Sequence, residues 1–537
     1  MNNMPNQRLR YALTSLLLLI ILLPLMIILG SPSQLNAEIW QHLADYLLWD
    51  LLQNTVVMVV GVAGLSLFIG VPLAWWVARY QFPGRRFFAW ALMLPLAIPA
   101  YVQAMALMGV YDFTGPIYAL CQFLKWPTDW IPQVRSMKGL IVSMAFAFYP
   151  YVFLLAKNAF ESMGQQAIEI GQSLGISPQK SVWRIALPLA RPWIAGGVLL
   201  VMMECLADFG SVSVFNIDTF TTAIYKSWFS FFSLETARQL ASLLILLVFL
   251  LLLLDLYVHQ RKAYHHTKSR PSIRVKHAHS GLVTLACSMV FGFAFVVPFT
   301  QLLVWSGSVW AEEVSLALLA LAARSAGLSF MAAVLIALFA LLFSVLIQPL
   351  KRQALFAKLA SLGYAMPGSI LAVGVFIPIA WFDQQMVSLF QLDSHASVLK
   401  GTLVVMLWAY LVRFYGVAHT AIGNGMRRIS PNHDAAARGL GLSTISRLFR
   451  VYLPMLKGSF FTAILMVFVD VMKEMPITLM TRPFGWDTLS TRIFAMTSEG
   501  MWEMAAPSAV LLIVVGLIPV ILIAKQASPH HASVKET

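Results

Sequence analysis

Long apolar runs separated by short polar segments dominate the chain and predict an all-α membrane protein. Each run has about twenty residues or more, which is the length that an α-helix needs to cross the hydrocarbon core of a bilayer. Helices are expected because lipid cannot satisfy backbone polar groups, whereas a helix satisfies its own. The runs lie near residues 11–30, 55–79, 88–111, 138–160, 193–216, 239–258, 280–304, 326–349, 356–381, 398–421, 458–480 and 506–525, twelve in all.

The polar segments between the runs predict the orientation of the chain. Lysine and arginine gather in alternate short loops, most densely in the linker 259–279. Because cytoplasmic loops are enriched in these two residues, both termini and this linker are expected to be cytoplasmic. The first run follows Arg8 and Arg10 and lacks a convincing small-residue cleavage site. It is therefore interpreted as a retained span rather than a signal peptide.

The second half of the chain repeats the first when Gly175 is aligned with Gly441. Six spans separate equivalent points, so the copies are expected to have the same orientation and to be related by an axis along the membrane normal. Prolines interrupt the third run at Pro95 and Pro99 and the ninth at Pro367, which predicts broken spans at matched places. The outer segment 218–225 recurs as 487–494. Both segments begin with residues that cap helices, so each predicts a short helix between the last two spans of its half.

A polar loop after the fourth run has a close copy after the tenth. The loops 165–192 and 431–458 align without a gap when Gly175 is placed on Gly441. Both loops then reach a leucine-proline step at the same distance from the glycine. The residues of the two steps are Leu187, Pro188, Leu453 and Pro454.

Each of these loops is predicted to form a helix, a sharp bend and a second helix. Gly175 and Gly441 can take the left-handed conformation that ends the first helix. Ser177 is suited to cap the second helix, with Pro178 in its first turn, and Ser443 has the same place in the second loop. The leucine-proline step is expected to end the second helix just before the next span.

The two loops resemble the signature of the permease subunits of ABC importers. In that family the signature reads Glu-Ala-Ala, three residues, Gly, nine residues, Ile, one residue and Leu-Pro. The first loop has Glu169, Gly175 and Ile185 at these places. It departs from the signature at Ile170 and Gly171, where the family has two alanines. The resemblance implies that the loop is a coupling helix, which docks into a cleft on an ATP-hydrolysing subunit.

The second loop departs from the signature at its start. Ala435 stands where the family has glutamate, and Asp434 and Ala436 are its neighbours. We therefore expect Glu169 and Asp434 to be the polar contacts to the ATP-hydrolysing subunits. A single such loop could equally be an amphipathic turn on the lipid surface, but two copies at matched positions favour coupling. The residues assigned to coupling are Glu169, Gly175, Ser177, Leu187, Pro188, Asp434, Ala436, Gly441, Ser443 and Pro454.

Two pairs of carboxylates lie inside apolar runs, where charged groups are costly and usually functional. Glu204 and Asp208 lie in the fifth run, four residues apart and so expected on one helix face. The alignment of the two halves carries them onto Asp470 and Glu474 in the eleventh run, where Lys473 is the only nearby base. We expect these five residues to form a translocation path or gate that favours a cationic substrate. The alternative is that they cap or pair locally, for example Asp470 with Lys473.

The sequence around these carboxylates resembles the permeases of ferric-iron importers. The segments that carry the resemblance are 204–215 with 218–225 in the first half and 473–489 in the second. The resemblance implies a fused permease that receives ferric iron from a periplasmic binding protein. Permeases for thiamine and for phosphonate compounds have similar motifs, so these cargoes stay open. A proton-driven secondary transporter with twelve spans, using the buried carboxylates as proton relays, is the alternative from another class.

The resemblance also implies the fold, the domains and the partners. The fold is that of a type I ABC importer permease, with twelve transmembrane helices as two parallel six-span repeats in a bacterial inner membrane. Two ATP-binding subunits at the cytoplasmic loops, a periplasmic substrate-binding protein and membrane lipid are the expected partners. The expected segments are an N-terminal span with an outer segment at 1–51, the first permease domain at 52–258, the basic linker at 259–279, the seventh span with an outer segment at 280–321, the second permease domain at 322–525 and a cytoplasmic tail at 526–537.

Composition and missing motifs exclude several other classes. The chain of 537 residues is 59% hydrophobic and 11% charged, which is typical of a polytopic membrane protein. Its net charge of +14 comes from alternate loops, so no nucleic acid is expected, and its three distant cysteines predict no disulfide or metal site. No phosphate-binding loop and no hydrolase motif occurs, so no catalytic residue and no cofactor are expected and ATP must be hydrolysed by a separate subunit. Five of the eleven histidines lie in the linker, which is interpreted as a solvated segment rather than a metal-sensing tract.

Overall fold

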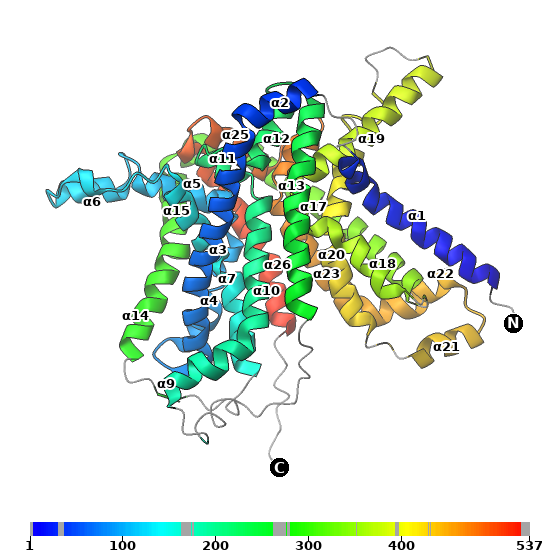
Figure 1. Ribbon diagram of the computed structural model, residues 1–537, viewed down its shortest axis with the longest axis horizontal. Helices are drawn as coiled ribbons and strands as arrows, with labels where there is room; N and C mark the ends of the chain where they lie inside the picture. Colours follow the sequence, from blue (N-terminus) through cyan, green and yellow to red (C-terminus); the bar gives the residue numbers. More distant parts are fainter. Residues whose placement is uncertain are drawn as a thin grey trace. The chain divides into compact units, whose positions relative to one another are not determined.

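Twelve helices of the described chain are long and apolar enough to cross a membrane, as the apolar runs predicted (Figure 1). The computed structural model describes residues 4–30, 37–162, 173, 177–260, 275–276, 280–348, 350, 352–391, 397–427, 429 and 431–527. These residues form two compact units, each of which is described by itself. One unit comprises Leu35–Trp310 and Ala495–Val510, and the other comprises Met1–Gln34, Ala311–Phe494 and Leu511–Thr537.

The unit that contains Leu35–Trp310 is built mainly from the first repeat. Its core is a packed group of three long helices, Leu48–Arg79, Met137–Ser162 and Leu187–Ala207. Small residues let their backbones approach closely. A Cβ added at Gly70 would lie 3.1 Å from the carbonyl oxygen of Tyr149, and one at Gly197 would lie 2.9 Å from the Cα of Val152. The helices of this unit are α2 (Ala37–Tyr46), α3 (Leu48–Arg79), α4 (Arg85–Ala91), α5 (Ala100–Tyr111), α6 (Pro116–Phe123), α7 (Met137–Ser162), α9 (Pro178–Ser181), α10 (Leu187–Ala207), α11 (Gly210–Val214), α12 (Phe220–Phe229), α13 (Leu234–Gln260), α14 (Ser280–Phe291) and α15 (Val297–Ser308).

The other unit is built mainly from the second repeat and has the same plan. The helices α17, α20 and α23 form its core. The hydroxyl of Tyr452 donates a hydrogen bond of 3.0 Å to Oε1 of Gln348 and so joins the loop 431–458 to the end of α17. The helices are α1 (Met4–Leu29), α16 (Trp310–Glu313), α17 (Leu316–Ile347), α18 (Gln353–Ala360), α19 (Gly368–Leu389), α20 (Leu403–Met426), α21 (Pro431–Gly439), α22 (Thr444–Arg447), α23 (Leu453–Lys473), α24 (Pro476–Thr481), α25 (Leu489–Ser498) and α26 (Trp502–Ala527), and of these α16, α25 and α26 are shared between the units.

The first span of each repeat packs within the unit that the other repeat builds. The indole Nε1 of Trp408 in α20 donates a hydrogen bond of 2.9 Å to the carbonyl of Ile20 in α1. In the first-repeat unit, the ring of Trp305 in α15 lies directly on Gly109 in α5, where a Cβ would collide with it. Each first span is therefore bound to its unit by contacts between residues far apart in the sequence.

The broken spans predicted at the prolines are present at matched places. In the first repeat, α4 ends at Ala91, a 3₁₀ turn covers Leu94–Ala97, and α5 begins directly after Pro99. In the second repeat, α18 and the 3₁₀ turn Ser361–Ala365 precede α19, which begins directly after Pro367. The candidate spanning stretch of the third span is Ala100–Phe123, which begins later than the run predicted at 88–111, and within it α5 ends at Tyr111, where that run was predicted to end. A two-residue parallel strand pair, β1 (Tyr80–Gln81) with β2 (Val275–Lys276), is the one sheet among the described residues.

Candidate coupling loops and membrane carboxylates

The second candidate coupling loop, 431–458, has the predicted helix, bend and helix. The helix α21 ends at Gly439, and Gly441 has a φ of +75°, in the left-handed region. The N–H groups of Leu440 and Leu442 donate to the carbonyls of Ala436 and Ala437 at 3.0 and 3.2 Å, which closes the end of the helix. The prediction for Gly441 is confirmed, and the reason is conformational, because nothing lies within 4 Å of a Cβ built there.

The helix after this bend begins with the predicted cap. The hydroxyl oxygen of Ser443 accepts a hydrogen bond of 3.2 Å from the N–H of Ser446, and α22 begins at Thr444. Ala436, which was also assigned to this loop, is exposed on α21. Asp434 also lies in α21, but its side chain lies outside the described residues.

The first candidate coupling loop, 165–192, is described at residue 173 and from residue 177 onward. Glu169 and Gly175 lie outside the described residues. The helix α9 begins at Pro178, as predicted, after Ser177 in an extended conformation. The side chain of Ser177 makes no capping hydrogen bond, so that part of the prediction was wrong. Its carbonyl oxygen instead accepts both the N–H and the hydroxyl of Ser181, at 2.9 and 3.1 Å.

The leucine-proline steps do not end a helix, contrary to the prediction. In each loop a π-turn directly precedes the step, at Val182–Ala186 and at Leu448–Tyr452, and the chain runs on without a break into α10 or α23. Proline lacks an N–H and its ring clashes with the carbonyl four residues earlier. The wider turn avoids this conflict, since the N–H of Leu187 reaches back five residues to the carbonyl of Val182. A third π-turn, Gly292–Val296, stands in the same way before Val297-Pro298.

Aromatic side chains project from these π-turns at matched positions. Trp183 is 72% exposed, and Phe449, which has the corresponding place in the second loop, is 57% exposed. Leu440 beside the glycine bend is 81% exposed. These three residues belong to none of the motifs found in the sequence. The available signal was an apolar residue at the same place in two otherwise polar and basic loops.

The paired carboxylates do not share one helix face, because the second member of each pair lies beyond its helix. The helix α10 ends at Ala207 and α23 ends at Lys473. Asp208 and Glu474 have extended backbone, with ψ angles of 130° and 116°. Glu204 and Asp470 remain inside the helices, where both are half-buried, as is Lys473.

Asp208 and Glu474 each cap the short helix that follows. The carboxylate of Asp208 accepts hydrogen bonds from the N–H groups of Ser211 and Val212 at 2.8 and 3.3 Å, at the start of α11. One oxygen of Glu474 accepts from the N–H of Ile477 at 3.1 Å, at the start of α24. Local capping was the alternative left open for these residues, and the geometry shows it for these two. For Glu204, Asp470 and Lys473 the role in translocation stays a prediction.

The backbone of the turns at Asp208 and Glu474 is held in the same way in both repeats. The donor comes from the second short helix after each turn, which is α12 or α25. The hydroxyl of Thr221 donates to the carbonyl of Asp208 at 2.8 Å, and the hydroxyl of Ser490 donates to the carbonyl of Glu474 at 3.2 Å. These donors lie in α12 and α25, the two short helices that the recurrent outer segment predicted. Both begin as predicted, because Thr219 and Thr488 lie at their starts and the backbone N–H of each donates to a threonine hydroxyl in the first turn.

The second repeat has a buried ion pair that its counterpart lacks. The guanidinium of Arg413 in α20 lies 3.3 Å from Oε2 of Glu474, and it donates to the carbonyl of Met366 at 3.3 Å. The alignment of the two halves places Ala147 at the position of Arg413 in the first repeat. Lys473 is therefore not the only base near these carboxylates. An arginine inside the tenth apolar run was the signal for this partner.

A glycine makes room for this ion pair. A Cβ added at Gly368 would lie 2.5 Å from Oε1 of Glu474 and 2.9 Å from Nη1 of Arg413. Gly368 follows Pro367 at the break of the ninth span, and Ala100 follows Pro99 at the corresponding break. The three differences between the repeats therefore occur together. Glycine, arginine and glutamate stand in the second repeat where alanine, alanine and aspartate stand in the first.

Twelve spans, matched broken helices and matched short helices after the fifth and eleventh spans define a two-repeat transport subunit of the membrane. The chain also belongs to a known family. The family described as binding-protein-dependent transport system inner membrane component matches residues 70–264 and again residues 350–528. The protein is thus a fused, two-half permease of an ABC importer in the inner membrane, with the type I fold expected from its loops.

Three relatives show the range of cargo in this family. The chain is 26% identical over 500 residues to the Fe(3+)-transport system permease protein FbpB 2 of Haemophilus influenzae, covering 89% of this chain and 90% of that protein. It is 29% identical over 201 residues to a probable sulfate transport system permease protein of Chlorokybus atmophyticus, covering 37% of this chain and 68% of that one. It is also 29% identical over 237 residues to a probable molybdenum ABC transporter permease of Haloferax volcanii, covering 43% of this chain and 83% of that one.

Proposed function

We propose that this permease imports ferric iron delivered by a periplasmic binding protein. The observation that supports this cargo is the similarity to the Fe(3+)-transport permease, which extends over 89% of this chain. The sulfate and molybdenum relatives cover 37% and 43% of it. The fused chain is therefore similar over most of its length to an iron permease and over less than half of it to these sulfate and molybdenum permeases.

Two ATP-binding subunits dock on the two cytoplasmic loops in this proposal. The exposed apolar side chains of Trp183, Phe449 and Leu440 supply area for such a contact, and Glu169 and Asp434 supply polar contacts. Gly441 sets the angle between α21 and α22, so that a push on one helix turns the other. Because α9 and α22 run through π-turns into the spans α10 and α23, movement of the loop is passed directly to a membrane helix.

The carboxylates of α10 and α23 act at the other end of these same helices. Glu204 and Asp470 line the path or its gate and favour a cationic cargo over an anionic one. Asp208, Lys473 and Glu474 complete the set, with Asp208 and Glu474 fixing the turns where α10 and α23 end. The binding protein docks on the outer face, near α12 and α25, and both termini are cytoplasmic.

Reconstituted transport tests this function. Proteoliposomes would hold the permease, its ATP-binding subunits and the binding protein, and would be offered radiolabelled ferric iron, sulfate and molybdate in separate assays. ATP-dependent accumulation of iron that disappears when the binding protein is left out is the expected result. Accumulation of sulfate or molybdate instead would keep the importer and replace the cargo. Accumulation driven by a proton gradient without ATP would contradict the coupling mechanism.

A further inference from the structure

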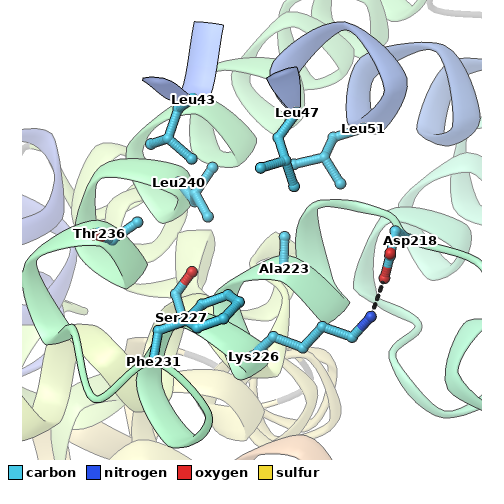
Figure 2. Close-up of a pocket in the computed structure, with 10 residues that line it drawn as sticks. All are labelled: Leu43, Leu47, Leu51, Asp218, Ala223, Lys226, Ser227, Phe231, Thr236 and Leu240. Carbon is cyan, nitrogen blue, oxygen red and sulfur yellow. Dashed lines mark hydrogen bonds and ion pairs between the residues drawn. The ribbon is translucent and has the colours of Figure 1, made fainter. Parts of the chain in front are cut away.

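A cavity of about 560 Å³ lies within the first-repeat unit, between α2, α3, α12 and α13 (Figure 2). Its volume is within the range of pockets that bury small molecules. Figure 2 shows leucine side chains from α2, α3 and α13 on one side and residues of α12 on the other. The lining residues are Leu43, Leu47, Leu51, Asp218, Ala223, Lys226, Ser227, Phe231, Thr236 and Leu240.

The lining combines an apolar interior with one pair of opposite charges. Leu43, Leu51 and Leu240 are buried, so the deep wall is formed by leucine side chains. At one side of the cavity the ammonium of Lys226 and the carboxylate of Asp218 form an ion pair (Figure 2). Both charged groups are about half exposed, at 45% and 50%, so they remain available to a ligand at the rim.

The walls of the cavity are fixed by hydrogen bonds. The side-chain amide of Asn54 in α3 donates to the carbonyl of Asp218 at 3.0 Å, which holds the segment before α12 against α3. Thr219 and Thr222 form a capping box at the start of α12. The hydroxyl of Ser233 accepts from the N–H of Thr236 at 3.2 Å at the start of α13. The cavity is therefore a preformed feature of the unit.

Exposed aromatic side chains surround this end of the two spans. Tyr46 and Trp49 project beside Leu47, at 72% and 70% exposed. Phe231 and Phe232 project from the turn between α12 and α13 and are also exposed. The membrane-spanning stretches begin nearby, at Leu48 in α3 and at Leu234 in α13. Since aromatic residues gather where hydrocarbon meets the headgroups, this ring of side chains places the cavity at that boundary.

We propose that this cavity binds one acyl chain of a zwitterionic phospholipid, with its headgroup on the Asp218–Lys226 pair. An apolar cavity gives water too few hydrogen-bond partners and accepts apolar molecules. The ammonium of the headgroup faces Asp218 and the phosphate faces Lys226. An anionic headgroup without an ammonium matches Lys226 alone and is repelled by Asp218. The lipid braces the short helix α12, whose Thr221 holds the turn at Asp208.

The second repeat does not reproduce this site. Aligning the outer segments 218–225 and 487–494 places Arg492 on Ala223 and Ala495 on Lys226. A large cation then stands where the cavity has a small apolar residue, and the corresponding acid, Asp487, pairs instead with Arg482. The lipid site is therefore specific to the first half, and it does not depend on which cargo the permease carries.

Photolabelling of the full-length permease tests the proposal. The permease would be reconstituted in vesicles of phosphatidylethanolamine and phosphatidylglycerol with a trace of phosphatidylethanolamine that carries a photoreactive group in one acyl chain. Label is expected on the peptides around residues 43–51 and 223–240. Ala223→Phe and Leu47→Trp, which fill the cavity from two sides, are expected to lower this label about tenfold, the change that a loss of about 1.4 kcal/mol of binding produces. Leu246→Phe, at an exposed position of α13, is the matched control and should keep the label.

A second variant tests the headgroup. Exchanging the charges in the double variant D218K/K226D keeps an ion pair but reverses its direction. The acyl label should remain, while competition by unlabelled phosphatidylethanolamine should no longer exceed competition by phosphatidylglycerol. Equal competition by the two lipids in the unsubstituted permease would overturn the headgroup assignment. Label spread evenly over the spans would overturn the site itself.

Discussion

The guanidinium of Arg413 lies 3.3 Å from the carboxylate of Glu474, and their side chains are only 12% and 6% exposed. This contact joins α20 to the turn where α23 ends. The hydrogen bond of Arg413 to the carbonyl of Met366 also links α20 to the break in the ninth span. The first repeat holds its corresponding turn at Asp208 by hydrogen bonds to backbone N–H groups and to a hydroxyl. The corresponding turns of the two repeats are therefore held by different contacts, with an ion pair only at Glu474 among the described residues.

Removing one member of the pair should destabilise the second-repeat unit strongly. Arg413→Ala leaves Glu474 charged and buried, which typically costs about 3–5 kcal/mol. Gly368→Ala should also destabilise, because its Cβ would overlap the carboxylate of Glu474. The measurement is thermal unfolding of the purified permease in lipid nanodiscs. The matched control is Ala100→Gly at the corresponding break, which removes no charge contact, and an Arg413→Ala variant as stable as the unsubstituted permease would contradict the argument.

A substitution at Gly441 tests whether the bend of the loop matters for coupling. It changes the backbone conformation without removing a side-chain contact. Gly441→Val places a β-branched residue at a φ of +75°, where the left-handed conformation costs roughly 1–2 kcal/mol. The bend between α21 and α22 should change, and transport per ATP hydrolysed should fall severalfold while ATP hydrolysis continues. Gly439→Val is the matched control, because Gly439 also has open space at its Cβ position but lacks a positive φ. An unchanged ratio of transport to hydrolysis in Gly441→Val would show that the bend has no part in coupling.

The exposed aromatic residues of the π-turns should contribute to docking of the ATP-binding subunits. Aromatic anchors dominate many protein interfaces. Trp183→Ser and Phe449→Ser should each weaken the association about tenfold or more, equivalent to a loss of about 1.4 kcal/mol. The measurement is the dissociation constant of the ATP-binding subunit from the permease in nanodiscs. Trp126→Ser, also exposed but between α6 and the next span, is the control. Equal dissociation constants for all three variants would place the interface elsewhere.

The sequence predicted the spans, their breaks and the short capped helices, because each depends on local chemistry. Run length in an apolar solvent determines the spans, proline determines the breaks, and threonine or serine determines the caps. The prediction that the leucine-proline steps end a helix was wrong. The preceding π-turn contains one residue more than an α-helical turn, which removes the clash of the proline ring with the backbone. That compensation involves backbone geometry over Val182–Ala186 and has no residue signature.

The site was harder to predict because it depends on contacts across the fold. Spacing of four residues suggested that Glu204 and Asp208 share a helix face, but capping of α11 draws Asp208 out of the helix. The partner of Glu474 comes from α20, and the space for it comes from a glycine at the start of α19. Pattern and alignment show which positions correspond between the repeats, but they do not show which side chains meet.

The remaining prediction concerns the carboxylates that stay inside the helices. Glu204→Gln and Asp470→Asn remove charge at nearly constant shape inside α10 and α23. If they favour a cationic cargo, each variant should lower ATP-driven uptake of ferric iron about tenfold, which corresponds to about 1.4 kcal/mol in the barrier. Assembly with the ATP-binding subunits and the thermal stability should be unchanged.

Two controls make this result specific. Glu499→Gln removes a charge at an exposed position and should leave uptake unaltered. Asp208→Asn weakens the cap of α11, so it should lower thermal stability as well as uptake. A loss of uptake that always follows a loss of stability would assign Glu204 and Asp470 to folding. Full uptake in both variants would remove them from the translocation path and leave cargo selection to the binding protein.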